Sequence, residues 1–157
     1  MLSYQSLLLL VWAALCAAGD ARYKRIDNRL ILVGAVVAIV PLLAWRQSLT
    51  GAAPGETLLT CGLALLFALP GYWKGRFGAG DVKLLLVLAL ASDSLYLLFS
   101  LAGAALGMVL WLLAAPALWP RLPPALHSAL PMLAPPAKVL PYAPFVFFGM
   151  LLATLVA

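Results

Sequence analysis

The stretch LLLLVWAALCAAGDARYKRIDNRLILVGAVVAIVPLLAW, residues 7–45, consists of two apolar runs separated by one basic loop. Residues 2–19, 30–45 and 95–119 contain no Asp, Glu, Lys or Arg. A helix that crosses the hydrocarbon core of a bilayer needs about 20 mostly apolar residues. The stretch therefore predicts two membrane-spanning helices joined by a short polar loop.

The composition extends this prediction to the whole chain. Of 157 residues, 66% are hydrophobic and 10% are charged, whereas a soluble domain has about 45–50% apolar and about 25% charged residues. We therefore expect an all-α, polytopic membrane helical bundle that forms a single domain over residues 1–157. It should hold about six transmembrane helices, near residues 3–19, 29–45, 57–69, 81–91, 95–115 and 140–156. The Pro-rich stretch 116–139 is not expected to form a regular helix.

The distribution of charge predicts the orientation of this bundle. The chain contains ten Lys and Arg and five Asp and Glu, which gives a net charge of +5. The basic residues are scattered between apolar runs and form no patch with aromatic residues, so we expect no nucleic-acid partner. Short cytoplasmic loops are enriched in Lys and Arg. All basic residues except Arg46 fall in loops on one predicted side, Arg121 and Lys138 in the last of them, which places three loops in the cytoplasm and both termini outside.

The helix predicted near residues 81–91 is unusually short. Eleven residues make about 16 Å of helix, roughly half of the hydrocarbon thickness. Either this helix starts in a cavity below the cytoplasmic surface, or the turn Ser92-Asp93-Ser94 that follows it is drawn inward. In both cases irregular backbone at membrane depth must be buried in protein or line a water-filled cavity.

Two of the five carboxylates, Asp20 and Asp81, lie at predicted cytoplasmic helix ends next to long apolar runs. A charge towards the centre of a bilayer costs about 2.5–3.5 kcal/mol, so such residues face a partner or a cavity. On one interpretation they are interfacial residues paired with bases such as Arg22 or Lys83. On the other they form a carboxylate pair that shares one proton and activates a water molecule for hydrolysis.

The residues before Asp81 favour the second interpretation. In Gly78-Ala79-Gly80-Asp81 an acid follows two glycines at a predicted helix start. Glycine adopts backbone conformations closed to other residues and allows another chain to approach closely, and the helix macrodipole stabilises an anion at the N-terminus. The reaction needs no metal, and the isolated Cys16 and Cys61 form no C-x-x-C motif. We therefore expect neither a metal site nor a cofactor.

Three motifs, in this order along the chain, resemble those of the type IV prepilin peptidases, membrane aspartic proteases of the G-x-G-D class. The first motif of that family is an aspartate followed by a basic stretch that ends in Ile-Pro-Asn, and residues 20–28 (DARYKRIDN) resemble it. Residues 78–84 (GAGDVKL) resemble G-x-G-D-x-K-L, and residues 141–144 (PYAP) resemble Pro-Tyr-x-Pro. The resemblance implies that Asp20 and Asp81 are the catalytic pair.

Six further residues of these motifs are expected to shape the site, namely Gly78, Gly80, Lys83, Asn28, Pro141 and Tyr142. Lys83 would stabilise the ionised pair or hold its loop to a lipid phosphate. Asn28 is expected to cap the second helix. Pro141 and Tyr142 would form the start of the last helix beside the cavity.

The resemblance also implies a substrate and a location. The chain would remove the basic leader of prepilins or pseudopilins at the cytoplasmic face of the cell inner (plasma) membrane, as a multi-pass protein, just after a glycine. Its partners would be that substrate, the lipid bilayer, and pilus or secretion assembly proteins. Asp27 stands where the family has proline, and the chain lacks the C-x-x-C loop of bifunctional members. It is thus similar to the short, peptidase-only type serving Flp/Tad pili, with no methyltransferase activity expected.

Three alternatives remain open at this point. An intramembrane G-x-G-D protease similar to signal peptide peptidases would cleave inside an apolar helix, but those chains are longer and carry the first acid in another motif. A proton-coupled carrier would show internal symmetry, and the sequence has no repeat. A non-enzymatic subunit of a pilus or secretion assembly should tolerate the loss of both acids.

Overall fold

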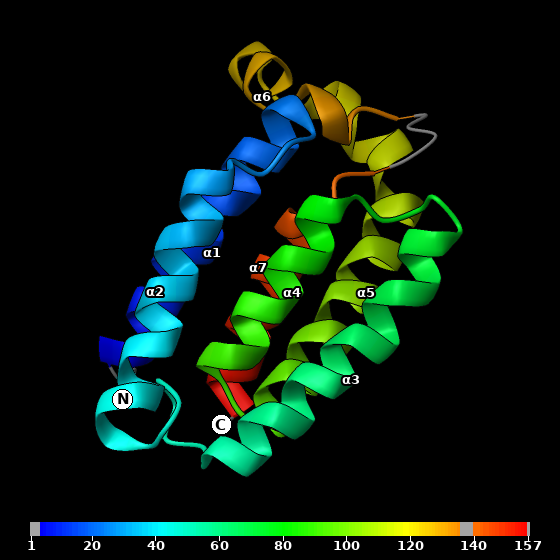
Figure 1. Ribbon diagram of the computed structural model, residues 1–157. Coiled ribbons are helices and arrows are strands. Elements are labelled where there is room, and N and C mark those ends of the chain that lie inside the picture. Colours follow the sequence, from blue (N-terminus) through cyan, green and yellow to red (C-terminus); the bar gives the residue numbers. More distant parts are fainter. Residues whose placement is uncertain (1–3, 136–139, 157) are drawn as a thin grey trace.

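A computed structural model describes residues 4–135 and 140–156, and within them all regular secondary structure is helical. This confirms the predicted all-α fold (Figure 1). The helices are α1 (Tyr4–Tyr23), α2 (Asn28–Trp45), α3 (Pro54–Trp73), α4 (Ala79–Ala91), α5 (Ser94–Leu118), α6 (Pro124–Ala129) and α7 (Ala143–Val156). Two 3₁₀ turns, Trp119–Arg121 and Pro131–Leu133, flank α6.

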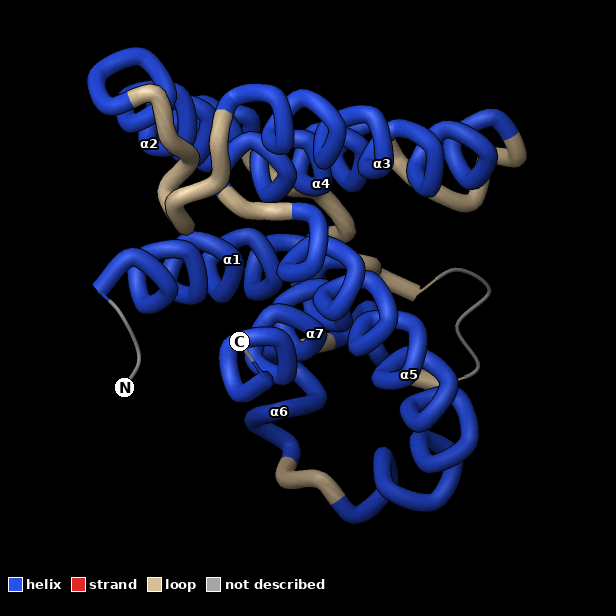
Figure 2. Tube along the Cα trace, turned by 90° about the horizontal axis from the view of Figure 1, so that it is seen from below, coloured by secondary structure: helices blue, strands red, loops and turns tan. Residues whose placement is uncertain are grey.

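The six longer helices form two layers of three. Figure 2 shows α2, α4 and α3 side by side in one layer and α1, α7 and α5 in the other. The central helix of each layer, α4 or α7, is the short one, and it packs between two longer neighbours. The start of α1 and the end of α7 lie at one end of the bundle, and α6 lies at the other (Figure 1).

The outer surface of the bundle is suited to lipid. Helices α1, α2 and α3 and the segment Ser94–Arg121 are long and apolar enough to cross a membrane, and α7 is a shorter apolar helix. Large apolar side chains stand outward on these helices, with 77% of Leu43 and 76% of Leu113 exposed. These features confirm the membrane helical bundle. With 13 residues, α4 reaches only about 20 Å.

Several helix boundaries differ from the prediction. The first helix does not end at residue 19, because Ala21 and Arg22 are good helix formers; it ends at Tyr23, before Lys24 turns to a φ of 50°. Asp20 therefore lies inside the last turn of α1. The third helix begins at Pro54 rather than 57, since a proline in the first turn gives up no hydrogen bond.

Prolines are also tolerated near two helix ends where the prediction placed a break. Helix α3 continues past Pro70 to Trp73, because a proline so near the end removes only one internal hydrogen bond. Likewise α5 runs through Pro116 to Leu118, and α6 forms within the stretch predicted to have no regular helix. The last helix begins at Ala143 rather than at residue 140. Lys138 lies outside the described residues.

The short helix α4 is accommodated by a loop that covers its C-terminal end. The backbone N–H of Thr50 donates to the carbonyl oxygen of Ala91 at 3.1 Å, and the Thr50 hydroxyl donates to Oδ2 of Asp93 at 3.1 Å. Ser92 is fully buried beneath them. The turn after α4 is thus covered by protein, and the start of α4 lines a cavity, so both explanations of the short helix stay open.

The cap of α2 is Asp27 and not Asn28, which is the first residue of the helix itself. Oδ1 of Asp27 accepts a hydrogen bond from the backbone N–H of Arg29 at 2.9 Å. The prediction was wrong by one residue because Asp and Asn are equally good caps and stand next to each other.

Asp27→Ala should therefore lower the free energy of unfolding by about 1 kcal/mol, the usual contribution of an N-terminal cap. Asp27→Asn should leave it unchanged, because the amide oxygen accepts the same hydrogen bond. Denaturation in detergent micelles measures both variants. Equal stability of Asp27→Ala and wild type would show that this hydrogen bond does not stabilise α2.

Candidate active site

A cavity of about 490 Å³ lies where α1 ends and where α4 and α7 begin. Side chains and backbone from residues far apart in the sequence line it. Every residue that the sequence assigned to the site is among them, namely Asp20, Asn28, Gly78, Gly80, Asp81, Lys83, Pro141 and Tyr142. The structure thus brings the three motifs to one place.

Asp20 is a buried acid, with 4% of its surface exposed. Its Oδ2 accepts a hydrogen bond from the backbone N–H of Ala143 at 2.9 Å. Ala143 is the first residue of α7, so the carboxylate meets the positive end of the helix macrodipole there. This contact joins the first motif to the third.

Asp81 lies half-buried in the first turn of α4. Its Oδ2 accepts a hydrogen bond from the backbone N–H of Gly78 at 2.8 Å, and its own N–H donates to the Gly78 carbonyl oxygen at 3.1 Å. The side chain therefore closes the start of α4 on itself. This reciprocal arrangement fixes where the Asp81 carboxyl group stands in the cavity.

Burial dominates the electrostatic environment of Asp81. Burial raises the pKa of Asp81 to about 6, the Gly78 N–H lowers it, the Asp20 charge raises it and the Lys24 cation lowers it. The Asp20 charge thus disfavours ionisation of Asp81, as expected for two acids that line one cavity. Burial and the Asp81 charge also raise the pKa of Tyr142 to about 12, so its hydroxyl stays protonated.

One interpretation paired Asp20 and Asp81 with bases such as Arg22 or Lys83. It is wrong for these two bases, because each makes a different contact. The Arg22 guanidinium lies 5.3 Å from the centre of the Tyr23 ring. Lys83 instead donates from Nζ to Oδ1 of Asn28 at 3.1 Å. Lys83 and Asn28 therefore tie α4 to the start of α2 at the edge of the cavity.

The two glycines before Asp81 provide space and not an unusual backbone conformation. Gly78 has a φ of −80°, which any residue adopts. A Cβ at Gly80 would lie 3.6 Å from Ile26, in ordinary contact. The predicted need for a special conformation is thus wrong at Gly78, and the absent side chains leave room in the cavity beside Asp81.

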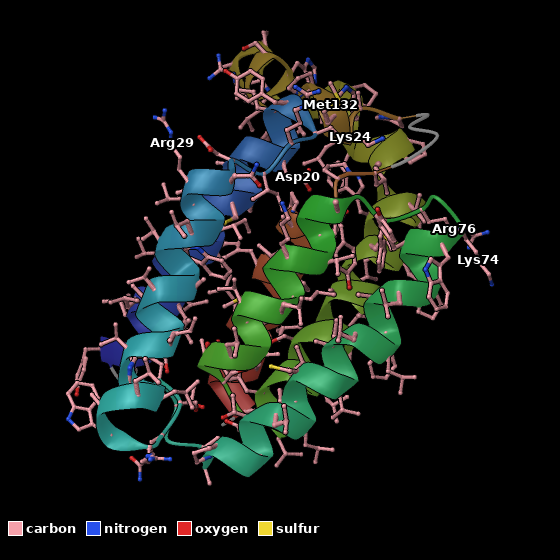
Figure 3. The ribbon with its side chains drawn as sticks, in the orientation of Figure 1. Asp20, Lys24, Arg29, Lys74, Arg76 and Met132 are labelled. Atoms are coloured by element: carbon pink, nitrogen blue, oxygen red, sulfur yellow. The ribbon has the colours of Figure 1, made fainter. Side chains whose placement is uncertain are left out.

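Five residues that line the cavity were not assigned to the site from the sequence, namely Lys24, Arg25, Ile26, Arg76 and Leu140 (Ala79 is the variable position of G-x-G-D). The basic residues among them lie in predicted cytoplasmic loops, and this position alone accounted for their charge. Figure 3 shows Lys24, Lys74 and Arg76 towards the same end of the bundle as Asp20. The one available signal was their closeness in sequence to the two acids.

Three comparisons relate the chain to known proteins. The model of the type IV leader peptidase family matches residues 7–119. That range is more than half of the chain, and it contains both acids and the G-x-G-D motif but ends before Tyr142. Neither the curated proteins nor the solved structures gave a significant match.

Proposed function

The chain belongs to the type IV leader peptidase family, and from this premise we propose that it is an aspartic endopeptidase in which Asp20 and Asp81 activate one water molecule. The observation that carries the proposal is that the two acids, from different helices, line one cavity, in which the Asp20 charge raises the pKa of Asp81. Two such carboxyls keep one proton between them over the pH range in which only one of them is ionised, because both cannot ionise together at low cost.

The proposed reaction uses both protonation states of the pair. The ionised acid takes a proton from the water as its oxygen attacks the scissile carbonyl carbon. The protonated acid donates its proton to the carbonyl oxygen, which gives a neutral tetrahedral intermediate. When the intermediate collapses, the first acid gives its proton to the leaving nitrogen and the second takes a proton from a hydroxyl of the intermediate, so that the C–N bond breaks and both acids return to their starting state. The Ala143 and Gly78 N–H groups hold the two carboxyls in place throughout.

We propose prepilins or pseudopilins as the substrates, cleaved after a glycine at the cytoplasmic face of the inner membrane. In support, Lys24 and Arg76 line the cavity and lie, with Lys74, towards the bundle end that holds Asp20 (Figure 3), and basic residues mark the cytoplasmic side. Both ends of the chain would then face outside, as a multi-pass topology with an even number of spans requires. Pilus or secretion assembly proteins remain proposed partners.

Mapping of the cleaved bond tests this function. The purified protein in nanodiscs receives a synthetic prepilin segment with a basic leader, a glycine and an apolar segment of about 20 residues. Mass spectrometry should find a single cut directly after the glycine. A cut inside the apolar segment would favour the intramembrane protease, and no cut by folded protein would favour a non-enzymatic subunit.

The pH dependence of cleavage should follow the Asp81 carboxyl. As pH rises through its pKa of about 6, the pair loses its shared proton, so kcat/KM should fall on the alkaline side. The Lys24 cation lowers that pKa. Lys24→Gln should therefore raise it and move the alkaline limb to higher pH. Arg29→Gln, at an exposed residue outside the cavity lining, should leave the limb in place. A limb that Lys24→Gln does not move would contradict the role of Asp81.

A further inference from the structure

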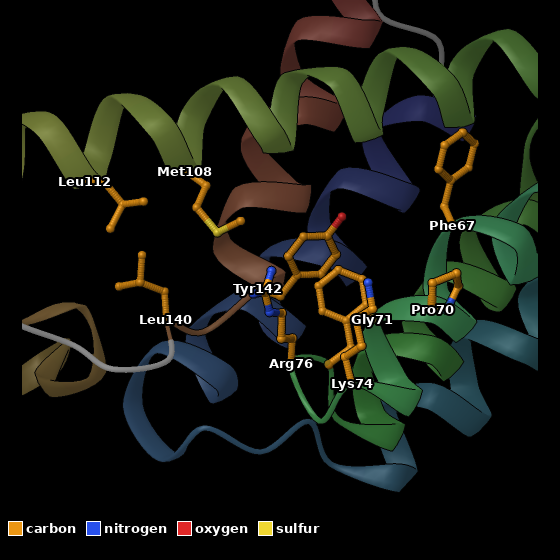
Figure 4. A pocket seen from close by; sticks show the side chains of 10 residues that line it. Phe67, Pro70, Gly71, Lys74, Arg76, Met108, Leu112, Leu140 and Tyr142 are labelled. Carbon is orange, nitrogen blue, oxygen red and sulfur yellow. The ribbon is translucent and has the colours of Figure 1, made fainter.

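A second cavity, of about 650 Å³, lies beside the first, between α3 and α5 (Figure 4). We infer that this α3–α5 groove, formed around Phe67, Pro70, Met108 and Leu112, binds the apolar segment of the substrate that adjoins the scissile bond. The inference rests on the proposed function. It adds a specificity site to the acids, and of the residues that the motifs assigned to the site only Tyr142 lines it.

The groove has the form of a helix-binding site. On α3 its lining residues stand at positions 67, 70 and 71, and on α5 at 108 and 112. Spacings of three and four residues place side chains on one helix face. Two parallel faces, each lined over about one turn, or about 6 Å, make a short groove in which part of an apolar helix can lie, a recurrent mode of peptide recognition.

The chemistry of the lining gives the groove a direction. Its walls are apolar apart from two cations, Lys74 and Arg76, just beyond the end of α3. These cations lie towards the end of the bundle that holds Asp20 (Figure 3). Since α3 and the α5 segment are long enough to cross a membrane, an apolar helix can enter between them without leaving the hydrocarbon.

The groove and the active-site cavity share a wall. Arg76, Leu140 and Tyr142 line both, and the Phe77 ring lies 4.5 Å from the Tyr142 ring on the groove side. Gly71 lets Phe77 pack there, because a Cβ on Gly71 would lie 2.7 Å from the Phe77 ring. A peptide seated in the groove therefore needs to cross only this aromatic wall to bring its next residues to the acids.

This continuity favours the substrate over a lipid as occupant. An acyl chain would also suit the apolar walls, and a phosphate would suit Lys74 and Arg76. A lipid, however, has no need of a wall in common with the two acids, whereas a substrate cleaved at the edge of its apolar segment must occupy both spaces at once.

Photocrosslinking tests the inference. The crosslinking residue p-benzoylphenylalanine replaces Met108 or Leu112 in the Asp81→Asn protein, which keeps the synthetic prepilin segment uncleaved. Both positions should crosslink to the first two turns of its apolar segment, as mapped by mass spectrometry. The matched control is Leu113, which is 76% exposed on the same helix and does not line the groove; it should yield at least tenfold less peptide adduct.

A kinetic measurement with cleavage-competent protein complements the crosslinks. Leu112→Trp should fill the groove and raise KM for the prepilin segment about tenfold while kcat stays within about twofold, and Leu113→Trp should change neither. Equal adducts at Leu113 and Met108, lipid adducts alone, or an unchanged KM would overturn the groove but leave the acids' role standing. If the wild type did not cleave the prepilin segment at all, both the groove and the proposed function would fall.

Discussion

Asp20→Asn and Asp81→Asn should each lower kcat/KM for the prepilin segment by about 10³-fold, within the range that general acid–base groups contribute. An amide neither takes a proton from water nor supplies one to the carbonyl oxygen. Because the two acids act as one unit, the double variant should lose hardly more activity than either single variant. The measurement is single-turnover cleavage followed on a gel.

The matched control for these variants is Asp27→Asn. Asp27 is an exposed acid seven residues from Asp20, and it does not line the cavity. This variant keeps its cap hydrogen bond and should cleave at the wild-type rate. Processing that survives Asp20→Asn or Asp81→Asn in folded protein would remove the pair from the mechanism, and a rate lost equally in Asp27→Asn would point to a general effect of charge.

Gly149→Ala should cost about 3 kcal/mol or more of unfolding free energy, at the upper end of the range for overpacking. A Cβ at this position would overlap the backbone oxygen of Ser100 and lie 2.7 Å from the Ala104 nitrogen. Both are backbone atoms of α5, which have no rotamer to change. Small residues at helix crossings let membrane helices approach this closely, and here they bring α7 against α5.

The same change should reduce cleavage, because α7 carries the Ala143 N–H that holds Asp20. Gly103→Ala, on the facing side, should act in the same direction, since its Cβ would lie 2.6 Å from the Cα of Gly149. Gly62→Ala is the control, with no atom within 4 Å of its Cβ. Thermal unfolding in detergent and the cleavage rate measure all three, and an unchanged melting temperature for Gly149→Ala would contradict the close crossing.

The sequence predicted the membrane bundle well, because composition reveals it, and it singled out two acids that the structure brings to one cavity. Charges are so rare in this chain that Asp20 and Asp81, each beside an apolar run, stand out. The position of each predicted helix was right, but its ends were less so. Proline and the choice between adjacent cap residues act through one or two hydrogen bonds, whose outcome depends on tertiary packing.

The sequence did not predict which helices meet. The hydrogen bond from Ala143 to Asp20 joins residues 123 positions apart. The apolar runs that form α1 and α7 carry no sequence pattern that predicts which helices pack together. The two-layer arrangement, the close approach at Gly149 and the α3–α5 groove follow from the same packing. The roles of Lys24 and Arg76 as lining residues were missed for this reason, since only the folded bundle shows which basic residues reach the cavity.

The central claim is that the Asp20 and Asp81 carboxyls hold one water molecule between them. The most direct measurement is an experimental structure in lipid at a resolution that shows ordered water in this cavity. The account predicts one water within hydrogen-bonding distance, about 2.6–3.2 Å, of a carboxyl oxygen of each acid. Carboxyls that face separate spaces, with a side chain between them and no water in reach of both, would contradict it.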